Sequence, residues 1–270
     1  MDRAGLIHVE LFRRGFYLTA GLTADGSSTI IPMLLPVLGA GAAAVLAGYH
    51  SMAPRSQWFG RAFCGVARGS RQMAFTFDDG PNDPHTLNLL DVLSKHNVPA
   101  TFFMIGRYVR LRPDIALEVK NRGHIVANHT FTHPFLTFAS SSSARSELEE
   151  CRAALTDAVG EHSNLFRPPW GARRPGILRT VRRLGLQPIM WSVTGFDWDA
   201  PSAEYIQKKV AARVRGGDVI LLHDGGHKAF GTDRSHTVKA VEALLTRYKG
   251  EGYEFVTIPE MMSRQSALLH

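Results

Sequence analysis

Short apolar runs alternate with helix-like segments from residue 73 onward. This alternation predicts repeated βα units. The expected strands are residues 73–77, 100–105, 124–127, 165–167, 187–193, 218–222 and 253–258. The expected helices are residues 85–96, 112–122, 143–160, 175–184, 202–214 and 234–249. Seven strands with helices between them favour an α/β fold, either a parallel barrel or a closed layered arrangement.

An uncharged apolar run covers residues 30–48, close to the ~20 residues of a membrane-spanning helix. Pro32, Pro36, Gly39 and Gly41 interrupt its helical continuity. Three interpretations remain open, namely a membrane anchor, an uncleaved or late-starting signal segment, and a soluble alanine-rich helix. More arginines follow the run than directly precede it, so the positive-inside rule favours a cytoplasmic position for the part after it.

The change of pattern predicts three regions. Residues 1–70 form an N-terminal region with the apolar segment and a linker, residues 71–262 form the main domain, and residues 263–270 form a C-terminal tail. A chain of 270 residues with 44% hydrophobic residues can bury a full core.

Charge and cysteine content narrow the classes of partner. The net charge of +7 favours an anionic neighbour, such as a membrane surface, a cell-wall polymer or nucleic acid. We expect no nucleic-acid partner, because no segment combines a dense Lys/Arg run with interleaved aromatic residues. With only Cys64 and Cys151, the chain has neither a disulfide framework nor a Cys-rich metal site. Any metal must therefore be held by histidines and carboxylates.

The unusual polar residues lie where expected strands end, which in a (β/α) barrel is where reactive groups gather. Asp78 and Asp79 end the first strand, in TFDDGP. Adjacent buried carboxylates repel each other unless a cation compensates. The alternative for this motif alone is an exposed turn that bends at Gly80.

Two histidines four residues apart follow the third expected strand, in the segment HTFTH. His129 and His133 can meet one cation if the segment forms a helical or tight-loop turn. Alone, the pair is equally consistent with a solvent-facing loop. Together with the paired aspartates it gives two histidines and one carboxylate, a ligand set typical of a catalytic metal.

Three further motifs carry candidate chemistry. In RPPWG, consecutive prolines fix the backbone after Arg167, which can pair with a carboxylate and keep it ionised. In FDW, Asp197 precedes Trp198, and in ILLHD, His223 ends an apolar strand beside an aspartate. A carboxylate that orients the His223 ring raises its pKa and makes it a proton donor near neutral pH. Taken singly, these motifs are also consistent with a rigid loop, a turn and a core histidine.

Taken in this order, TFDDGP, HTFTH, RPPWG, FDW and LLH resemble the five motifs of the polysaccharide deacetylase family, the NodB-homology enzymes of carbohydrate esterase family 4. The resemblance covers about residues 72–262. It implies a distorted (β/α) barrel with about seven parallel strands, and hydrolysis of N-acetyl or O-acetyl groups on sugars.

The resemblance also implies roles for the reacting groups. Asp78 is the expected general base, and Asp79, His129 and His133 are the expected ligands of a divalent metal. The expected metal is zinc, with cobalt or nickel also suited to these ligands. His223 is the expected general acid.

The remaining motif residues support this chemistry in the same resemblance. Arg167 pairs with the base and Asp197 tunes the acid. The backbone N–H of Trp170 is the expected oxyanion donor. The expected substrate-binding residues are Trp170, Trp198, Leu222 and Pro168.

Three positions depart from the family pattern without removing a reacting group. Trp170 stands where tyrosine is more usual, Thr194 replaces the first acid of Asp-x-x-Asp-Trp, and Ile220 replaces the first leucine of the last motif. These departures bear on substrate preference rather than on activity.

The main functional hypothesis is deacetylation of N-acetylglucosamine in a polysaccharide such as peptidoglycan or a chitin-like glycan. Two other enzymatic hypotheses are deacylation or deformylation of a lipid-linked sugar at the membrane, and acetylxylan esterase activity. The non-enzymatic alternative is an inactive glycan-binding module, which is expected to lack a reacting group. We expect a cell-envelope or membrane-associated location, with the cytoplasmic face as one orientation.

Overall fold

The computed structural model describes residues 30–267, with side chains from residue 38 onward. The chain divides into two units, Met1–Tyr49 and His50–His270. Helix α1 (Ile30–Met52) covers the apolar run, whose prolines and glycines do not break it. The side chains of residues 30–37 lie outside the described part. Within that part, no helix combines the length and the apolar character that crossing a membrane requires. Membrane association therefore stays a prediction.

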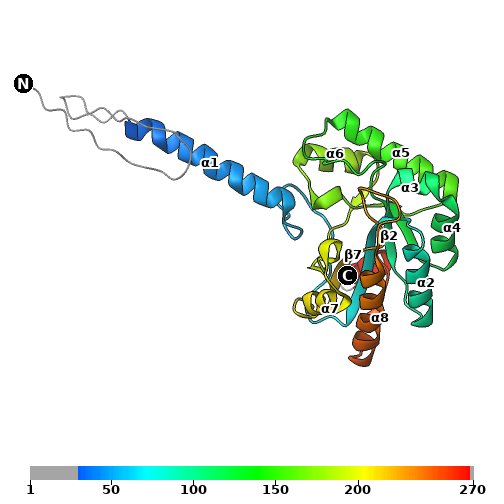
Figure 1. The fold of residues 1–270 in the computed structure, drawn as a ribbon. Helices are drawn as coiled ribbons and strands as arrows, with labels where there is room; N and C mark the ends of the chain where they lie inside the picture. The colour runs from blue at the N-terminus through cyan, green and yellow to red at the C-terminus, as the bar shows by residue number, and fades with distance from the viewer. Residues whose placement is uncertain (1–29, 268–270) are drawn as a thin grey trace, which may run out of the picture. The chain divides into compact units, whose positions relative to one another are not determined.

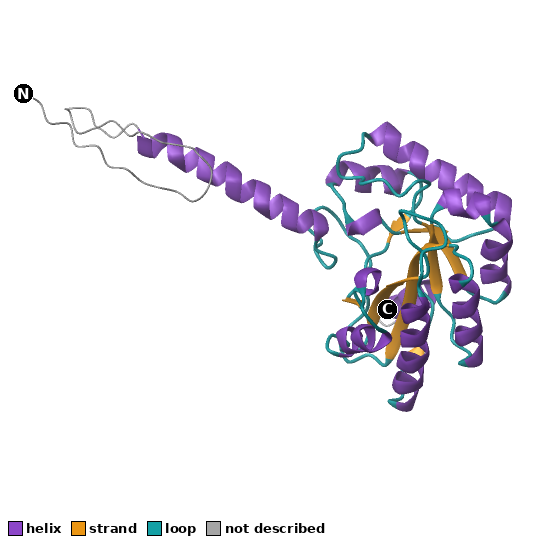
Figure 2. Cartoon of the chain, viewed as in Figure 1, coloured by secondary structure: helices purple, strands orange, loops and turns teal. Residues whose placement is uncertain are grey.

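An eight-stranded sheet forms the centre of the second unit. Its strands are β1 (Gln72–Gly80), β2 (Thr101–Met104), β3 (Ile125–Asn128), β4 (Leu165–Phe166), β5 (Gln187–Pro188), β6 (Val193–Thr194), β7 (Asp218–His223) and β8 (Glu254–Phe255). The order is β5-β4-β3-β2-β1-β7-β6, with β8 also paired to β1. All these pairs are parallel, and the sheet curls into a half-barrel (Figure 2). The predicted distorted (β/α) barrel is confirmed.

The helices that connect the strands are α2 (His85–Lys95), α3 (Gly106–Leu111), α4 (Pro113–Asn121), α5 (Ser141–Val159), α6 (Pro175–Arg183), α7 (Ala203–Ala211) and α8 (Ser235–Gly250), and α9 (Ile258–Ala267) follows the last strand. All six expected helices form. Helices α3 and α9 were not expected, and the predicted tail from residue 263 begins inside α9. Figure 1 shows α2 and α8 beside each other along the strands.

Alternation along the strands separates two hydrophobic clusters, because successive side chains of a strand point to opposite faces. On β1, Met73, Phe75 and Phe77 pack against the helices. Ala74 faces the other way, in a cluster inside the barrel with Phe103 and others. The side chains of Ala74, Thr76 and Asp78 therefore lie on the same, inward face of β1.

The expected strand at residues 187–193 is two strands at opposite ends of the sheet. β5 pairs with β4, whereas β6 pairs with β7. Between them, the Ile189 N–H donates to Phe166 O, and the Ser192 N–H donates to Val219 O. The chain changes partner between these points and so bridges the open sides of the barrel. The segment QPIMWSV reads as one strand in the sequence, and this hid the change of partner.

The second unit begins at His50, ahead of the boundary predicted at residue 71. The buried guanidinium of Arg173 donates to Ala53 O at 2.6 Å, and Ser51 Oγ donates to Arg173 O at 2.6 Å. Phe63 forms a bridge with Ile189. The backbone carbonyl of Ala53 thus satisfies part of the buried Arg173 guanidinium. A pattern of hydrophobic residues does not reveal contacts of this kind.

Candidate active site

A bulge at the end of β1 lets two adjacent carboxylates face one cavity. In a regular strand, Asp78 and Asp79 would point to opposite faces. The register with β2 shifts here, because Asp78 pairs with Phe103 and Gly80 with Met104. Asp79 is the extra residue and has a φ of 73°. The bulge therefore turns the Asp79 carboxylate toward the side that Asp78 already faces.

The segment from His129 to His133 is a tight loop rather than a helix. Asn128 Oδ1 accepts a hydrogen bond from the Thr130 N–H at 2.9 Å, and Thr130 Oγ1 accepts one from the His133 N–H at 3.1 Å. Thr130 and His133 both have positive φ, at 68° and 65°. This local network supplies the tight-loop turn that the spacing of the two histidines requires.

One glutamate on α5 fixes the middle of this loop. Glu147 Oε2 accepts hydrogen bonds from the N–H groups of Phe131 and Thr132, at 2.9 and 2.8 Å. Its Oε1 accepts one from Thr132 Oγ1 at 2.6 Å. Glu147 therefore anchors the loop between the two histidines.

Asp79, His129 and His133 form a buried group that can hold a metal ion, the one such group among the described residues. Asp79 Oδ1 lies 3.5 Å from His129 Nε2 and 3.3 Å from His133 Nε2. This buried oxygen has no hydrogen-bond partner. On the other side of the His129 ring, Nδ1 lies 2.8 Å from Arg167 O, which orients Nε2 toward Asp79. A divalent cation fits this donor set and would satisfy the orphaned oxygen.

The protonation of these groups suits cation binding. Burial and the neighbouring His129 lower the pKa of His133 to about 3, so its ring is neutral. Burial opposes ionisation of Asp79, but the facing imidazoles hold its pKa well below the usual value. A neutral imidazole and an ionised carboxylate are the forms that ligate metals.

Asp78 is paired with a fully buried arginine. Arg167 Nη1 donates to Asp78 Oδ1 at 2.7 Å and to Thr76 Oγ1 at 2.8 Å. Its guanidinium stacks over the Phe103 ring at 4.1 Å. Burial lowers the pKa of Arg167 while Asp78 opposes that shift. The pair places a positive charge directly beside the Asp78 carboxylate.

His223 lies beside Asp78, because β7 pairs His223 with Asp78 across the sheet. Its Nδ1 lies 2.8 Å from Asp197 Oδ1, and its N–H donates to Asp197 Oδ2 at 2.7 Å. Thr237 Oγ1 donates a further hydrogen bond to Asp197. Burial opposes the charged ring, yet Asp197 raises the pKa of His223 to about 9. The ring therefore holds a proton at neutral pH, with Nε2 left for the cavity.

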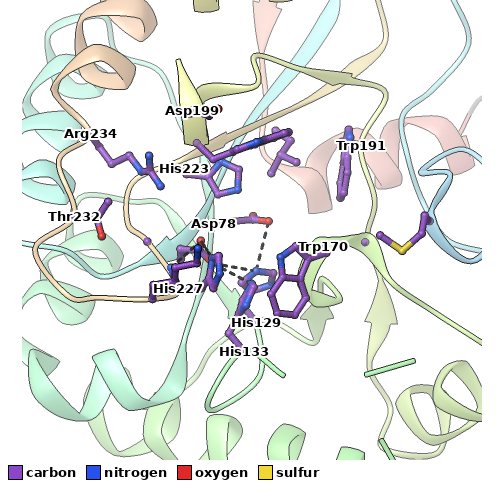
Figure 3. A pocket seen from close by; sticks show the side chains of 17 residues that line it. Asp78, His129, His133, Trp170, Trp191, Asp199, His223, His227, Thr232 and Arg234 are labelled. Atoms are coloured by element: carbon purple, nitrogen blue, oxygen red, sulfur yellow. Dashed lines mark hydrogen bonds and ion pairs between the residues drawn. The ribbon is translucent and has the colours of Figure 1, made fainter. Parts of the chain in front are cut away.

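These groups meet in one cavity of about 630 Å³. Figure 3 shows Asp78, His129, His133 and His223 around a common space. The lining residues are Met52, Asp78, Asp79, His129, His133, Trp170, Gly171, Trp191, Trp198, Asp199, Leu221, His223, Gly226, His227, Lys228, Thr232 and Arg234. The cavity thus combines a group that can hold a cation, a carboxylate paired with an arginine and a protonated imidazole.

Known proteins resemble this chain over most of its length. A sequence model of the polysaccharide deacetylase family matches residues 65–189. A chitooligosaccharide deacetylase of Bradyrhizobium sp. (strain ANU 289) is 37% identical over 207 residues, which cover 73% of this chain and 93% of that protein. The chain belongs to the polysaccharide deacetylase family.

Two further members extend the comparison. A peptidoglycan-N-acetylglucosamine deacetylase of Bacillus cereus is 35% identical over 199 residues, or 73% of this chain and 91% of that protein. A crystal structure of a peptidoglycan N-acetylglucosamine deacetylase, in complex with 4-naphthalen-1-yl-N-oxidanyl-benzamide, superposes with a TM-score of 0.68. It is 33% identical and covers 74% of this chain and 91% of that one. The present chain is thus a polysaccharide deacetylase.

The walls of the cavity differ in two places from those expected for this deacetylase. Leu222 does not line the cavity and is buried in the cluster under the helices, whereas Leu221 does line it. Strand alternation explains the error, since Leu221 shares the face of His223 and Leu222 has the opposite one. Pro168 is buried and outside the lining; it fixes the backbone that precedes Trp170. Trp170 and Trp198 both line the cavity, as expected.

Sequence reasoning missed His227 at the deacetylase site. Its N–H donates to Asp79 Oδ2 at 3.2 Å, and its ring stacks on His133 with centroids 4.6 Å apart. His227 therefore occupies the second oxygen of Asp79 and leaves Oδ1 for a cation. The segment HDGGH places a second histidine close after His223, which was the available signal.

Asp224 does not orient His223, although it is adjacent in sequence. Its Oδ2 accepts a hydrogen bond from Thr86 Oγ1 at 2.5 Å, and burial raises its pKa to about 7. A Cβ at Gly80 would lie 2.1 Å from this carboxylate, so only glycine fits there. The orienting carboxylate is Asp197, as the family resemblance implied.

Proposed function

We propose that this polysaccharide deacetylase uses a divalent metal ion, zinc in the first instance, to hydrolyse the N-acetyl groups of N-acetylglucosamine in a polysaccharide. One observation carries the proposal: the Asp79, His129 and His133 group shares its cavity with Asp78 and His223. The names of the relatives support the substrate, since they are deacetylases of chitooligosaccharide and of peptidoglycan N-acetylglucosamine. Such a substrate favours a location at the cell envelope.

The division of roles follows from the contacts of each group. A bound divalent cation supplies Lewis acidity, which lowers the pKa of water and polarises the acetyl carbonyl. Asp78, paired with Arg167, accepts the proton of the attacking water. His223, held protonated by Asp197, donates a proton to the departing amine. The Trp170 N–H is assigned to the oxyanion.

The test is acetate release by the full-length protein from N-acetylglucosamine oligomers and from peptidoglycan. Activity is measured as purified, after chelation, and after Zn²⁺ is restored. We expect release that disappears with the chelator and returns with Zn²⁺. Unchanged release after complete removal of metal, verified by elemental analysis, would refute the metal requirement. Release of acetate from acetylxylan alone, or of formate from a lipid-linked sugar alone, would refute the proposed substrate.

A further inference from the structure

Three exposed aromatic side chains continue the wall of the cavity onto the loop that follows His133. The Trp170 ring lies 4.3 Å from that of His133, and the Phe135 ring lies 5.4 Å from Trp170. The Phe138 ring then lies 5.4 Å from Phe135. We call Trp170, Phe135 and Phe138 the aromatic row. Trp170 lines the cavity and the two phenylalanines do not, so the row leads from the metal-binding group outward.

The row is exposed although its loop is firmly held. Phe138 is 87% exposed, Trp170 41% and Phe135 37%. Between the two phenylalanines, Leu136 is fully buried in the cluster beneath α5 and α6. Leu136 thus takes the inward position of the loop and leaves its aromatic neighbours on the surface.

Hydrogen bonds fix the backbone on the far side of the loop. Arg174 Nε donates to Thr137 O at 3.0 Å, and its Nη2 donates to Ala139 O at 2.7 Å. Ser140 then caps α5 by accepting from the Ser143 N–H at 3.0 Å. The phenylalanines are therefore presented by an anchored backbone. Leaving large apolar rings in water is unfavourable, so a contiguous exposed row points to a ligand.

We propose that the aromatic row is a subsite for the sugar residues that flank the residue being deacetylated. The proposal rests on the proposed function. A pyranose ring presents a flat face of C–H groups, and an aromatic ring presents a flat π face of the matching size. Because Trp170 belongs to both the cavity and the row, a glycan with one residue at the metal-binding group extends directly over Phe135 and Phe138.

The chemistry around the row favours an uncharged ligand. Residues 134–140 contain no charged side chain, and the guanidinium of the neighbouring Arg174 is hydrogen-bonded to the carbonyls of Thr137 and Ala139. A surface that binds anionic lipids normally combines its aromatic residues with lysine or arginine on the same segment. A neutral N-acetylglucosamine chain, by contrast, presents flat apolar faces that match such a segment.

The subsite predicts that chain length governs affinity. A dimer of N-acetylglucosamine reaches the cavity and Trp170, whereas a pentamer also reaches Phe135 and Phe138. In the full-length Zn²⁺-loaded protein, Phe138→Ala should raise the KM for the pentamer roughly three- to ten-fold and leave its kcat unchanged. The KM for the dimer should not change. Leu117→Ala, which shortens an exposed apolar side chain on α4, is the matched control and should alter neither substrate.

Conservative variants separate stacking from general apolar contact. Phe138→Tyr keeps a flat ring and should retain the wild-type KM for the pentamer. Phe138→Leu keeps apolar area but no flat face, and should behave like Phe138→Ala. A leucine variant with the wild-type KM would overturn the stacking subsite. An equal change of KM for dimer and pentamer would do the same.

A binding measurement separates failure of the subsite from failure of the proposed function. In the Asp78→Asn background, calorimetry should show weaker pentamer binding when Phe138→Ala is added. Equal affinity would overturn the subsite whatever the activity of the wild type, whereas absent acetate release would count only against the proposed function. If Phe138→Ala instead dissolves a dimer in sedimentation and leaves the KM for the pentamer unchanged, the row is an interface between two copies.

Discussion

The active site has two halves that are built in different ways. Asp78 and His223 stand on neighbouring strands, and their placement follows from the pairing of β1 with β7. His129 and His133 stand on a loop, and their placement depends on hydrogen bonds accepted by the side chains of Asn128, Thr130 and Glu147 rather than on sheet register. The strand-borne half is fixed by the same contacts that fix the fold, whereas the loop-borne half needs its own scaffold. The two halves should therefore respond differently to substitution.

The largest effect is expected from the strand-borne half. Asp78→Asn keeps the shape of the side chain but removes the basic oxygen and the negative charge. We expect kcat to fall by about 10²–10⁴, the usual contribution of a general base, with metal content unchanged. Acetate release and elemental analysis measure the two quantities. A variant with near-wild-type kcat and full metal content would remove Asp78 from the chemistry.

The same substitution leaves the buried Arg167 guanidinium without its counter-charge. The melting temperature of the Asp78→Asn variant should therefore be measured together with its kcat, so that a folding defect is not mistaken for the loss of the general base. The control is Asp91→Asn, which breaks a surface ion pair with Arg122 and should affect neither activity nor metal content.

An intermediate effect is expected from the scaffold of the loop-borne half. Glu147→Gln replaces one accepting oxygen with a donor that faces the N–H groups of Phe131 and Thr132. The loop loses hydrogen bonds, and the metal Kd should rise roughly 10-fold, as when a residue that supports metal ligands is removed. Competition with a zinc-binding dye measures that Kd. Glu150→Gln, on the same helix and bonded only to the Ser146 hydroxyl, should not change it.

If Glu147→Gln lowered kcat of the metal-saturated protein but left the metal Kd unchanged, the loop would not be the support of the metal ligands. The contrast between the two halves would then be lost. Saturating Zn²⁺ should instead restore most of the activity of this variant.

The smallest effect is a displacement of the pH profile. His223 must be protonated to act as the general acid. Deacetylase activity should therefore be present below the pKa of His223 in the folded protein, about 9, and should be lost as the pH rises through that value. Asp197→Asn removes the charge that raises this pKa, and the alkaline limb of kcat/KM should move toward the ordinary 6.5. The exposed Asp199 lies two residues away, and Asp199→Asn should leave the limb in place. If the alkaline limb of kcat/KM stayed in place in the Asp197→Asn variant, that limb would report the titration of a group other than His223.

The sequence located the strand-borne groups well, because apolar runs end visibly at Asp78 and His223. It also placed the two histidines next to the third strand. The wall of the cavity was harder to predict: the family resemblance implied Leu222, whereas two-residue periodicity puts Leu221 on the face of His223.

Other features could not be obtained from the pattern. The bulge that turns Asp79 depends on the register with β2, which is a property of two strands. Glu147 lies on a helix surface and resembles any solvated glutamate until the loop is placed over it. The split of the expected strand 187–193 follows from a change of partner within one buried segment. In each case the missing information is long-range, whereas sequence patterns are local.

Arg167 serves the two halves through different atoms. Its guanidinium pairs with Asp78, while its backbone carbonyl orients His129. A substitution at position 167 replaces the side chain but keeps the backbone carbonyl. The contact that orients His129 is therefore retained in such a variant. The contact with Asp78, by contrast, is made by the Arg167 side chain and is lost on substitution. In the proposed mechanism, a single substitution at residue 167 or 78 removes turnover and leaves the three proposed metal ligands in place, so metal retention alone is a poor marker of activity among relatives.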